Sequence, residues 1–309
     1  MSVPPELQRE PPNTYFVQDR SGRVELQRLQ LQDQMLMTAL GGVLPEQPTP
    51  THFGHILDVG CGTGGWLLKT ANTYPTARSL VGIDISPQMI AYAREQVAAS
   101  PDPSRIRFLQ MDALGRLDFP DHSFDLVNHR FGASFLRRWE WPKLLREYQR
   151  VCQPGGVIRI TEFDVGETDH SPALEVLSAL FVQALFQAGR FFTKDKRGLS
   201  SQLVPLLQQA GLKSIQSRAW TLSYQAGTSQ GQLFVEDISA LYRTLLPFLR
   251  KWTKVPSNYE EIYQQALVEM QQPTFVATMS VLTAWGETST RQPKKKPAAY
   301  DIIDTDNTR

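Results

Sequence analysis

Short apolar segments alternate with amphipathic segments through the middle of the chain. Five apolar segments predict strands, at 55–60, 79–84, 105–112, 124–130 and 157–164. Most of them are continuously apolar, which is typical of parallel strands buried on both faces of a sheet. The intervening segments predict helices, and one of these begins at Ser86 and Pro87, a favoured N-cap followed by a favoured first helical residue. The alternation predicts a doubly wound α/β fold with a mostly parallel sheet.

This alternation ends after Asp164. The later segments predict a helix at 172–189, a helix at 199–211, a strand at 212–224, helices between 233 and 271, and a strand at 274–285. Pro247 falls inside the long helical segment that begins at Leu233, and we expect it to kink that helix.

The composition is that of an ordinary globular protein and excludes several classes. The 32 basic residues are balanced by 31 acidic ones, so no long-range field favours nucleic acid or an anionic membrane as a partner. Two cysteines, Cys61 and Cys152, are too few for a disulfide framework or a cysteine-based zinc site. The sequence has no membrane-length apolar run and no apolar N-terminal core, and we expect a cytoplasmic protein without a membrane partner.

The segment from Asp58 to Gly65 is a glycine-rich turn between a predicted strand and a predicted helix. Glycine adopts positive φ and admits a ligand close to the backbone, which indicates a nucleotide-binding turn. Gly60, Gly62 and Gly65 also satisfy the spacing of a dinucleotide site, and Asp84 follows at the distance expected for a ribose ligand. An NAD-dependent dehydrogenase is therefore one alternative.

The acid before the turn favours a different ligand. At Asp58 a carboxylate would repel a pyrophosphate, whereas S-adenosylmethionine carries an ammonium, a sulfonium and no phosphate. Asp84 and Asp112 end the second and third predicted strands, where they suit the ribose hydroxyls and the adenine amine. Because ligands bind beyond the carboxyl ends of the strands in such sheets, three acids at successive strand ends predict one S-adenosylmethionine site.

Five segments together carry a family resemblance. They are LDVGCGTGGW (57–66), GIDIS (82–86), MDAL (111–114), DHSFDLVNHRF (121–131) and RVCQPGGVIRITEFD (150–164). With these motifs the chain resembles the class I S-adenosylmethionine-dependent methyltransferases, especially the group of ubiquinone and menaquinone biosynthesis. The resemblance implies a Rossmann-like sheet of seven strands, the last one antiparallel, with helical lid insertions and S-adenosylmethionine as cofactor.

We expect the following division of the chain and the following cofactor site. The division is a disordered arm at 1–14, a helical segment at 15–48 that covers the cofactor, a methyltransferase domain at 49–287 with lids at about 165–198 and 227–273, and a polar tail at 288–309. The resemblance implies that the cofactor-binding residues are Tyr15, Asp58, Gly60, Cys61, Gly62, Asp84, Ile85, Met111, Asp112, Ala113 and Asn128.

His129 is the candidate for a catalytic base. It ends the fourth predicted strand beside Asn128, where the family places residues near the transferred methyl group. A histidine accepts a proton near neutral pH, although a histidine that only bonds the loop backbone is the alternative. The acids around His170 do not predict a metal site, because strand alternation places neighbouring acids on opposite faces.

The acceptor is expected to be a small molecule. The segment from Asn128 to Phe131 differs from the Asn/Asp-Pro-Pro-aromatic signature of enzymes that methylate nucleobase or glutamine amines. The lids carry the aromatic residues Phe181, Phe186, Phe191, Phe192, Tyr242, Phe248 and Trp252. We expect methyl transfer to oxygen or carbon of a lipophilic or aromatic molecule. The alternatives are the same fold using S-adenosylmethionine without transfer, as a cyclase or binding protein, and, third, the dehydrogenase.

Overall fold

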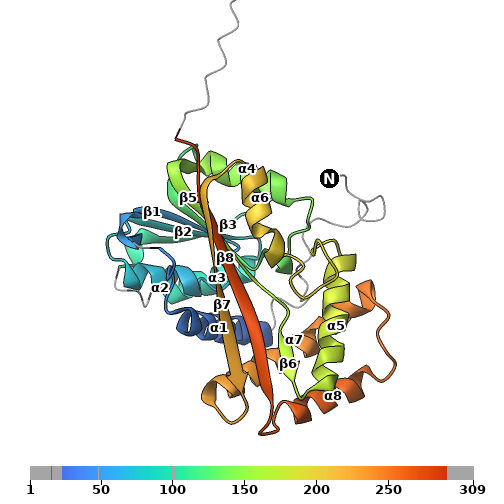
Figure 1. Cartoon of the computed structure of the whole chain (residues 1–309). Coiled ribbons are helices and arrows are strands. Elements are labelled where there is room, and N and C mark those ends of the chain that lie inside the picture. Colours follow the sequence, from blue (N-terminus) through green and yellow to red (C-terminus); the bar gives the residue numbers. More distant parts are fainter. Residues whose placement is uncertain (1–14, 16–22, 48, 99, 101, 291–309) are drawn as a thin grey trace, which may run out of the picture.

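The computed structural model describes residues 15, 23–47, 49–98, 100 and 102–290. In this part the backbone forms a sheet in the strand order β3-β2-β1-β4-β5-β8-β6, with β7 paired to β8 (Figure 1). The strands are β1 (His55–Val59), β2 (Ser79–Asp84), β3 (Ile106–Gln110), β4 (Phe124–Arg130), β5 (Cys152–Phe163), β6 (Glu167–Asp169), β7 (Lys213–Gln225) and β8 (Val276–Glu287). The expected arm at 1–14 and the tail from residue 291 onward lie outside the described residues.

The strand directions confirm the predicted Rossmann-like sheet. Strands β1 to β5 pair in parallel, and β8 runs antiparallel between β5 and β7. All seven predicted strands are present, and the sequence missed only β6. This three-residue strand pairs with the first residues of β8, where Thr168 lies opposite Ala277. A strand this short leaves no readable alternation of apolar and polar residues.

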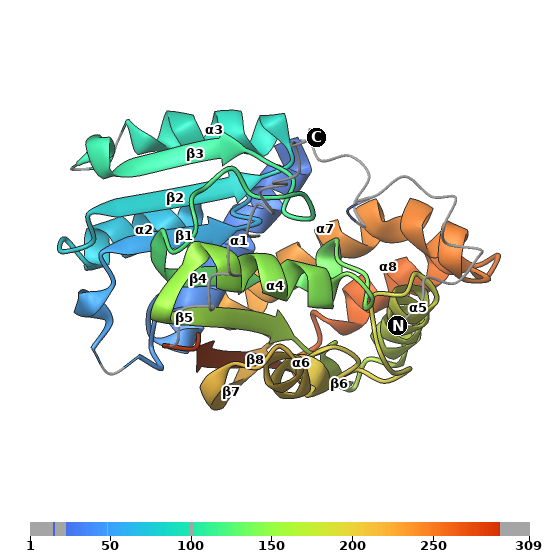
Figure 2. The same cartoon turned by 90° about the horizontal axis from the view of Figure 1, so that it is seen from above.

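Helices cover both faces of the sheet and one end of it. They are α1 (Arg23–Leu40), α2 (Gly65–Thr73), α3 (Pro87–Val97), α4 (Trp141–Val151), α5 (Pro172–Gln187), α6 (Leu203–Gln209), α7 (Ser229–Trp252) and α8 (Tyr259–Glu269). Helices α1 to α3 lie on one face of the sheet, and α4 and α6 lie on the other (Figures 1 and 2). The predicted cap of α3 is present, because Ser86 Oγ accepts a hydrogen bond from the backbone N–H of Met89.

The three remaining helices form a separate group beyond the sheet. Helix α5 packs against α7 and α8, and α1 packs against α7, so that α1 connects this group to the sheet (Figure 2). Pro247 lies inside α7, which the structure assigns as one helix from residue 229 to residue 252. Within the described residues, none of these helices is both long enough and apolar enough to cross a bilayer.

The central strands are buried on both faces, as their continuous apolar sequence predicts. Ile56 and Leu57 of β1 and Leu126 and Val127 of β4 are all 0% exposed. Full burial of such a side chain stabilises the fold by about 1.5–3 kcal/mol. The rigid centre of the sheet therefore holds the loops that follow β1, β2 and β4 in fixed positions, and these loops surround the pocket described next.

Candidate cofactor and acceptor site

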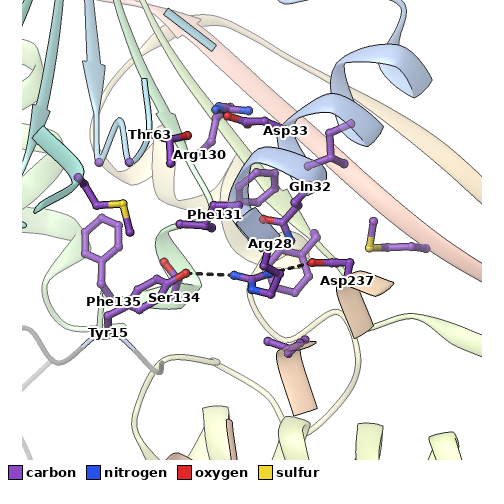
Figure 3. Close-up of a pocket in the computed structure, with 18 of the residues that line it drawn as sticks. Tyr15, Arg28, Gln32, Asp33, Thr63, Arg130, Phe131, Ser134, Phe135 and Asp237 are labelled. Atoms are coloured by element: carbon purple, nitrogen blue, oxygen red, sulfur yellow. Dashed lines mark hydrogen bonds and ion pairs between the residues drawn. The ribbon is translucent and has the colours of Figure 1, made fainter. Parts of the chain in front are cut away.

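One pocket extends from the glycine turn after β1 to the inner faces of α5 and α7. Gly60 and Gly62 line it at the sheet, and Phe181 and Leu241 line it at the lids. Helix α1 contributes Arg28, Gln32 and Asp33 to the wall (Figure 3). The pocket therefore has a sheet end and a lid end, with α1 passing between them.

At the sheet end the turn requires its glycines. Gly62 has a φ of +53°, and a Cβ atom added there would meet nothing within 4 Å, so the backbone is open to the pocket. Gly60 has a φ of +68°, and its added Cβ would lie 3.3 Å from the ring of Phe135. Positive φ disfavours other residues, and the open side of Gly62 allows a ligand to approach the backbone.

The acids predicted at the next two strand ends lie beside this turn. Asp84 Oδ2 accepts a hydrogen bond from the Gly62 N–H at 3.1 Å, and Oδ1 accepts one from the Ser86 N–H at 2.8 Å. Asp112 is exposed at the pocket edge, where its Oδ1 accepts from the Leu114 N–H. The predicted residues that line the pocket together are Tyr15, Gly60, Cys61, Gly62, Asp84, Ile85, Met111, Asp112 and Ala113.

Asp58 and Asn128 occupy a different place from the one expected. Both are buried, and the residues described as lining the pocket do not include them. They are register partners on β1 and β4, and Asn128 Nδ2 donates to Asp58 Oδ1 at 2.7 Å. The next register partner, Arg159 of β5, donates to Asn128 Oδ1 at 2.7 Å and pairs with Glu46. These side chains form a polar row behind the turn.

The charge of Asp58 reaches the pocket only indirectly. Burial raises the pKa of Asp58 to about 6, and the nearby Arg130 guanidinium opposes this rise. Asp58 Oδ2 has no hydrogen-bond partner within the described residues. The carboxylate of Asp58 therefore does not contact the pocket. Its predicted attraction for a cationic ligand acts over a distance, through the residues that line the pocket.

His129 points away from the pocket. Its side chain is 0% exposed, and its Nδ1 lies 2.6 Å from the hydroxyl of Tyr148 on α4. The rings of Trp141 and Phe135 pack against it. Burial lowers the pKa of His129 to about 3, so the ring stays neutral at physiological pH. The expectation that His129 lies near the acceptor does not match this placement, because consecutive strand residues face opposite sides of a sheet.

Several polar residues of the pocket were not singled out from the sequence. Arg130 follows His129 and faces the pocket, where its Nη2 pairs with Asp33 Oδ1 of α1 at 2.9 Å. Arg28 of α1 pairs with Asp237 of α7 at 3.0 Å and with Glu25 at 2.7 Å. The sequence carries no signal for the Arg130–Asp33 and Arg28–Asp237 pairs, because the two members of each pair are far apart along the chain.

Arg28 is the centre of a buried charge cluster between the two ends of the pocket. Its guanidinium also lies 3.3 Å from the Tyr15 hydroxyl (Figure 3). This hydroxyl donates a hydrogen bond to Glu25 at 3.0 Å. Burial raises the pKa of Asp237, and the Arg28 charge lowers it. Two carboxylates already neutralise Arg28, so the cluster holds α1 against α7 and leaves little positive charge for an anionic ligand.

The lid end of the pocket is mostly apolar. Two of the seven lid aromatics, Phe181 and Tyr242, line the pocket, as do Leu174, Leu241 and Met279. The hydroxyls of Ser178 and Tyr242, 3.3 Å apart, supply polar groups inside this lobe. The composition of this lobe, which we call the acceptor lobe, suits an apolar molecule with few hydrogen-bonding groups.

A loop after β4 joins the two ends. Phe131 and Phe135 of this loop line the pocket, and Phe131 has a φ of +58°. Glu162 accepts hydrogen bonds from the N–H groups of Gly132 and Ala133, and Arg190 donates to the carbonyls of Ala133 and Ser134. The loop is therefore held from two sides by buried side chains.

The sheet end fits the cofactor that the sequence motifs imply. The open backbone at Gly62 admits a ligand, Asp84 offers carboxylate oxygens beside it, and Ile85 and Met111 add apolar surface. This combination of hydroxyl acceptors and apolar faces suits an adenosine group. The nearby Asp33 and Arg130 add opposite charges where a zwitterionic group would extend.

Comparison with known proteins supports a methyltransferase that uses S-adenosylmethionine. The family model described as methyltransferase domain matches residues 56–156. Demethylmenaquinone methyltransferase of Bacillus licheniformis is 29% identical over 177 residues, which cover 53% of this chain and 73% of that protein. The matched family segment contains the glycine turn and the first four strands.

Solved structures of similar fold include two with different activities. Phosphoethanolamine N-methyltransferase 2 of Haemonchus contortus, in complex with phosphomonomethylethanolamine and S-adenosylhomocysteine, is similar at a TM-score of 0.50 and 18% identity, over 90% of this chain and 61% of that one. The cyclase SpnF is similar at a TM-score of 0.51 and 20% identity, over 91% and 99%. At such identities the likeness shows the fold alone.

Proposed function

We propose that this chain, whose residues 56–156 match the methyltransferase domain family, transfers a methyl group from S-adenosylmethionine to a carbon or oxygen atom of a lipophilic or aromatic small molecule. The observation that carries this proposal is the continuous pocket that joins the glycine turn to the apolar acceptor lobe. Transfer requires the acceptor atom to lie in line with the reactive methyl group, with water excluded. One continuous pocket under two lid helices meets both requirements.

The residues at the sheet end are assigned to the cofactor. Asp84 would accept hydrogen bonds from the ribose hydroxyls, Asp112 would accept one from the adenine amine, and Ile85 and Met111 would pack against the adenine ring. When bound, S-adenosylmethionine supplies a methyl group already activated by its positive sulfur. The protein therefore binds, orients and encloses the two reactants, and Phe131 and Phe135 separate the reacting atoms from the solvent.

The acceptor lobe is assigned to the methyl acceptor. Its apolar side chains favour an apolar ring or tail, and Ser178 and Tyr242 offer hydroxyls to a polar substituent. The printed activity of the Bacillus licheniformis relative makes quinone-type rings the first compounds to test. Where the acceptor must lose a proton, Asp164 and Asp237 are two of the carboxylates that line the pocket, and His129 is turned away.

The test is mass spectrometry of products formed with a methyl-labelled cofactor. Hydroquinones, phenols and prenylated ring compounds are offered as acceptors, and the label is expected in at least one of them. If S-adenosylhomocysteine binds but no apolar acceptor gains the label, the proposed acceptor class is wrong. Conversion of an acceptor without label transfer would instead support the alternative in which the cofactor is held but not consumed.

Asp84→Ala is expected to weaken S-adenosylhomocysteine binding by roughly 10- to 100-fold, measured by calorimetry. The substitution removes the carboxylate assigned to the ribose and the acceptor for the Gly62 N–H. Asp118→Ala removes an equal charge at an exposed position outside the pocket lining and serves as the control. Equal affinities of the Asp84 variant and the wild type would show that the ribose lies elsewhere.

Leu241→Trp is expected to lower kcat/KM for the acceptor by at least roughly 10-fold while S-adenosylhomocysteine binding stays unchanged. Leu241 of α7 lines the acceptor lobe, which the larger indole would partly fill. Val176→Trp places the same ring on the exposed side of α5, where Val176 is 43% exposed. A similar loss of activity in both variants would argue against the assignment of this lobe to the acceptor.

A further inference from the structure

The ion pair between Arg130 and Asp33 lies at the edge of the proposed adenosine site. Arg130 ends β4 and Asp33 lies in the middle of α1, and Arg130 Nη2 is 2.9 Å from Asp33 Oδ1. Their side chains are 13% and 15% exposed, and both line the pocket beside Thr63 (Figure 3). The pair therefore faces the space into which a ligand held at the glycine turn extends.

The guanidinium retains binding capacity beyond this pair. Arg130 Nε is buried and has no hydrogen-bond partner within the described residues. The ring of Phe131 lies 5.6 Å and the ring of Trp66 lies 5.9 Å from its central carbon, so aromatic faces hold the group in place. A planar guanidinium fixed in this way matches the two oxygens of a carboxylate.

Asp33 is placed equally well for a cation. Its carboxylate lies over Gly65, where an added Cβ would come within 2.7 Å of Asp33 Oδ2. Gly65 is the first residue of α2, and the positive end of a helix stabilises an ionised carboxylate. The buried Asp58, close enough for Arg130 to influence its pKa, adds negative potential behind the same wall.

We propose that Arg130 and Asp33 recognise the zwitterionic amino-acid end of the cofactor, and that the bound zwitterion adds a ligand-mediated link between α1 and the sheet. Arg130 binds the α-carboxylate, and Asp33 binds the α-ammonium. Each charge loses one partner and gains another, so neither is left desolvated without a counter-charge. Because one member lies on the sheet and the other on α1, the bound zwitterion bridges the two elements.

Helix α1 then transmits this contact to the acceptor lobe. Five residues before Asp33, the same helix carries Arg28, which pairs with Asp237 of α7. A cofactor that lacks the amino-acid end leaves this side of α1 joined to β4 only as it is without a ligand, by the direct pair between Arg130 and Asp33. The amino-acid end therefore determines both the affinity of the cofactor and the order of the helix that separates it from the acceptor.

The experiment compares two ligands by calorimetry: S-adenosylhomocysteine, and 5′-methylthioadenosine, which lacks the amino-acid end. Arg130→Met and Asp33→Asn are each expected to weaken S-adenosylhomocysteine binding by about 10- to 100-fold and to leave methylthioadenosine binding unchanged. Arg130→Lys, which keeps the charge, is expected to recover part of the loss. Arg146→Met removes an equal charge from the exposed surface of α4 and should change neither affinity.

Hydrogen exchange of the α1 amides provides the second measurement. In the wild type, S-adenosylhomocysteine is expected to slow exchange in residues 25–40, and methylthioadenosine is not; in Arg130→Met neither ligand should slow it. The proposal is overturned if the Arg130 and Asp33 variants lose affinity for both ligands equally, or for neither. Retained methylthioadenosine binding shows that the variants are folded, and binding of neither ligand to the wild type would contradict the cofactor assignment itself.

Discussion

Gly64→Ala is expected to lower the free energy of unfolding by about 3–5 kcal/mol, measured by urea denaturation. Gly64 has a φ of +78°, and an added Cβ would lie 2.5 Å from the ring of the buried Phe108 and 3.0 Å from Ala93 Cβ. Phe108 also packs over Gly82, where an added Cβ would come within 2.5 Å of the same ring. The ring of Phe108 therefore cannot move away from an added Cβ without a clash elsewhere.

The matched control is Gly211→Ala. Gly211 has a φ of +83°, and its added Cβ meets nothing within 4 Å. That variant carries the cost of the left-handed backbone alone, about 1–2 kcal/mol. The difference between the free energies of unfolding of the two variants measures the cost of the overlap with Phe108. Equal losses of stability in both variants would contradict the packing of Phe108 against Gly64.

The stability of the protein is expected to fall as the pH rises from about 4.5 to about 8, because of Glu162. Burial raises the pKa of Glu162 from its ordinary 4.5 to about 8. In this range the folded protein holds a proton that the unfolded chain has released, so the contribution is fully present below pH 4.5 and is lost as the pH rises. The full loss corresponds to about 5 kcal/mol, as an upper limit.

The measurement is urea denaturation at several pH values for the wild type and Glu162→Gln. The amide keeps an acceptor for the N–H of Gly132 or Ala133 and does not titrate. We expect the wild-type free energy of unfolding to decline relative to that of the variant, most steeply between pH 5 and 8, and to level off above the folded pKa. If the free energy of unfolding depended on pH in the same way in both proteins, Glu162 would not be the group responsible.

The sequence predicted which residues lie together at one edge of the sheet, because these positions are set by the backbone. The apolar strands placed the ends of β1, β2 and β3 at one edge of the sheet, and this brought Gly60, Asp84 and Asp112 into one pocket. Their positions follow from chain direction and short loops alone. Positive φ at the glycines and carboxylates at the strand ends depend on residues that are close along the chain. Such local features can be predicted from the sequence alone.

Side-chain direction was the point at which sequence reasoning failed. Both Asn128 and His129 were expected beside the cofactor, although neighbours on a strand face opposite sides. The structure places Asn128 in the polar row with Asp58 and turns His129 toward Tyr148 of α4. The next residue, Arg130, returns to the cofactor face and reaches the pocket, although it was not among the residues expected at the site.

The sequence by itself determined the fold and the cofactor, and it predicted the edge of the sheet where we place that cofactor, because apolar periodicity and turn chemistry act between residues that are close along the chain. Only the tertiary structure decided how the pocket is closed. The pairs Arg130–Asp33 and Arg28–Asp237 join residues of distant segments, and such pairs exist only when packing brings both elements together. The acceptor lobe likewise depends on how α5, α7 and β8 meet, which no single segment specifies.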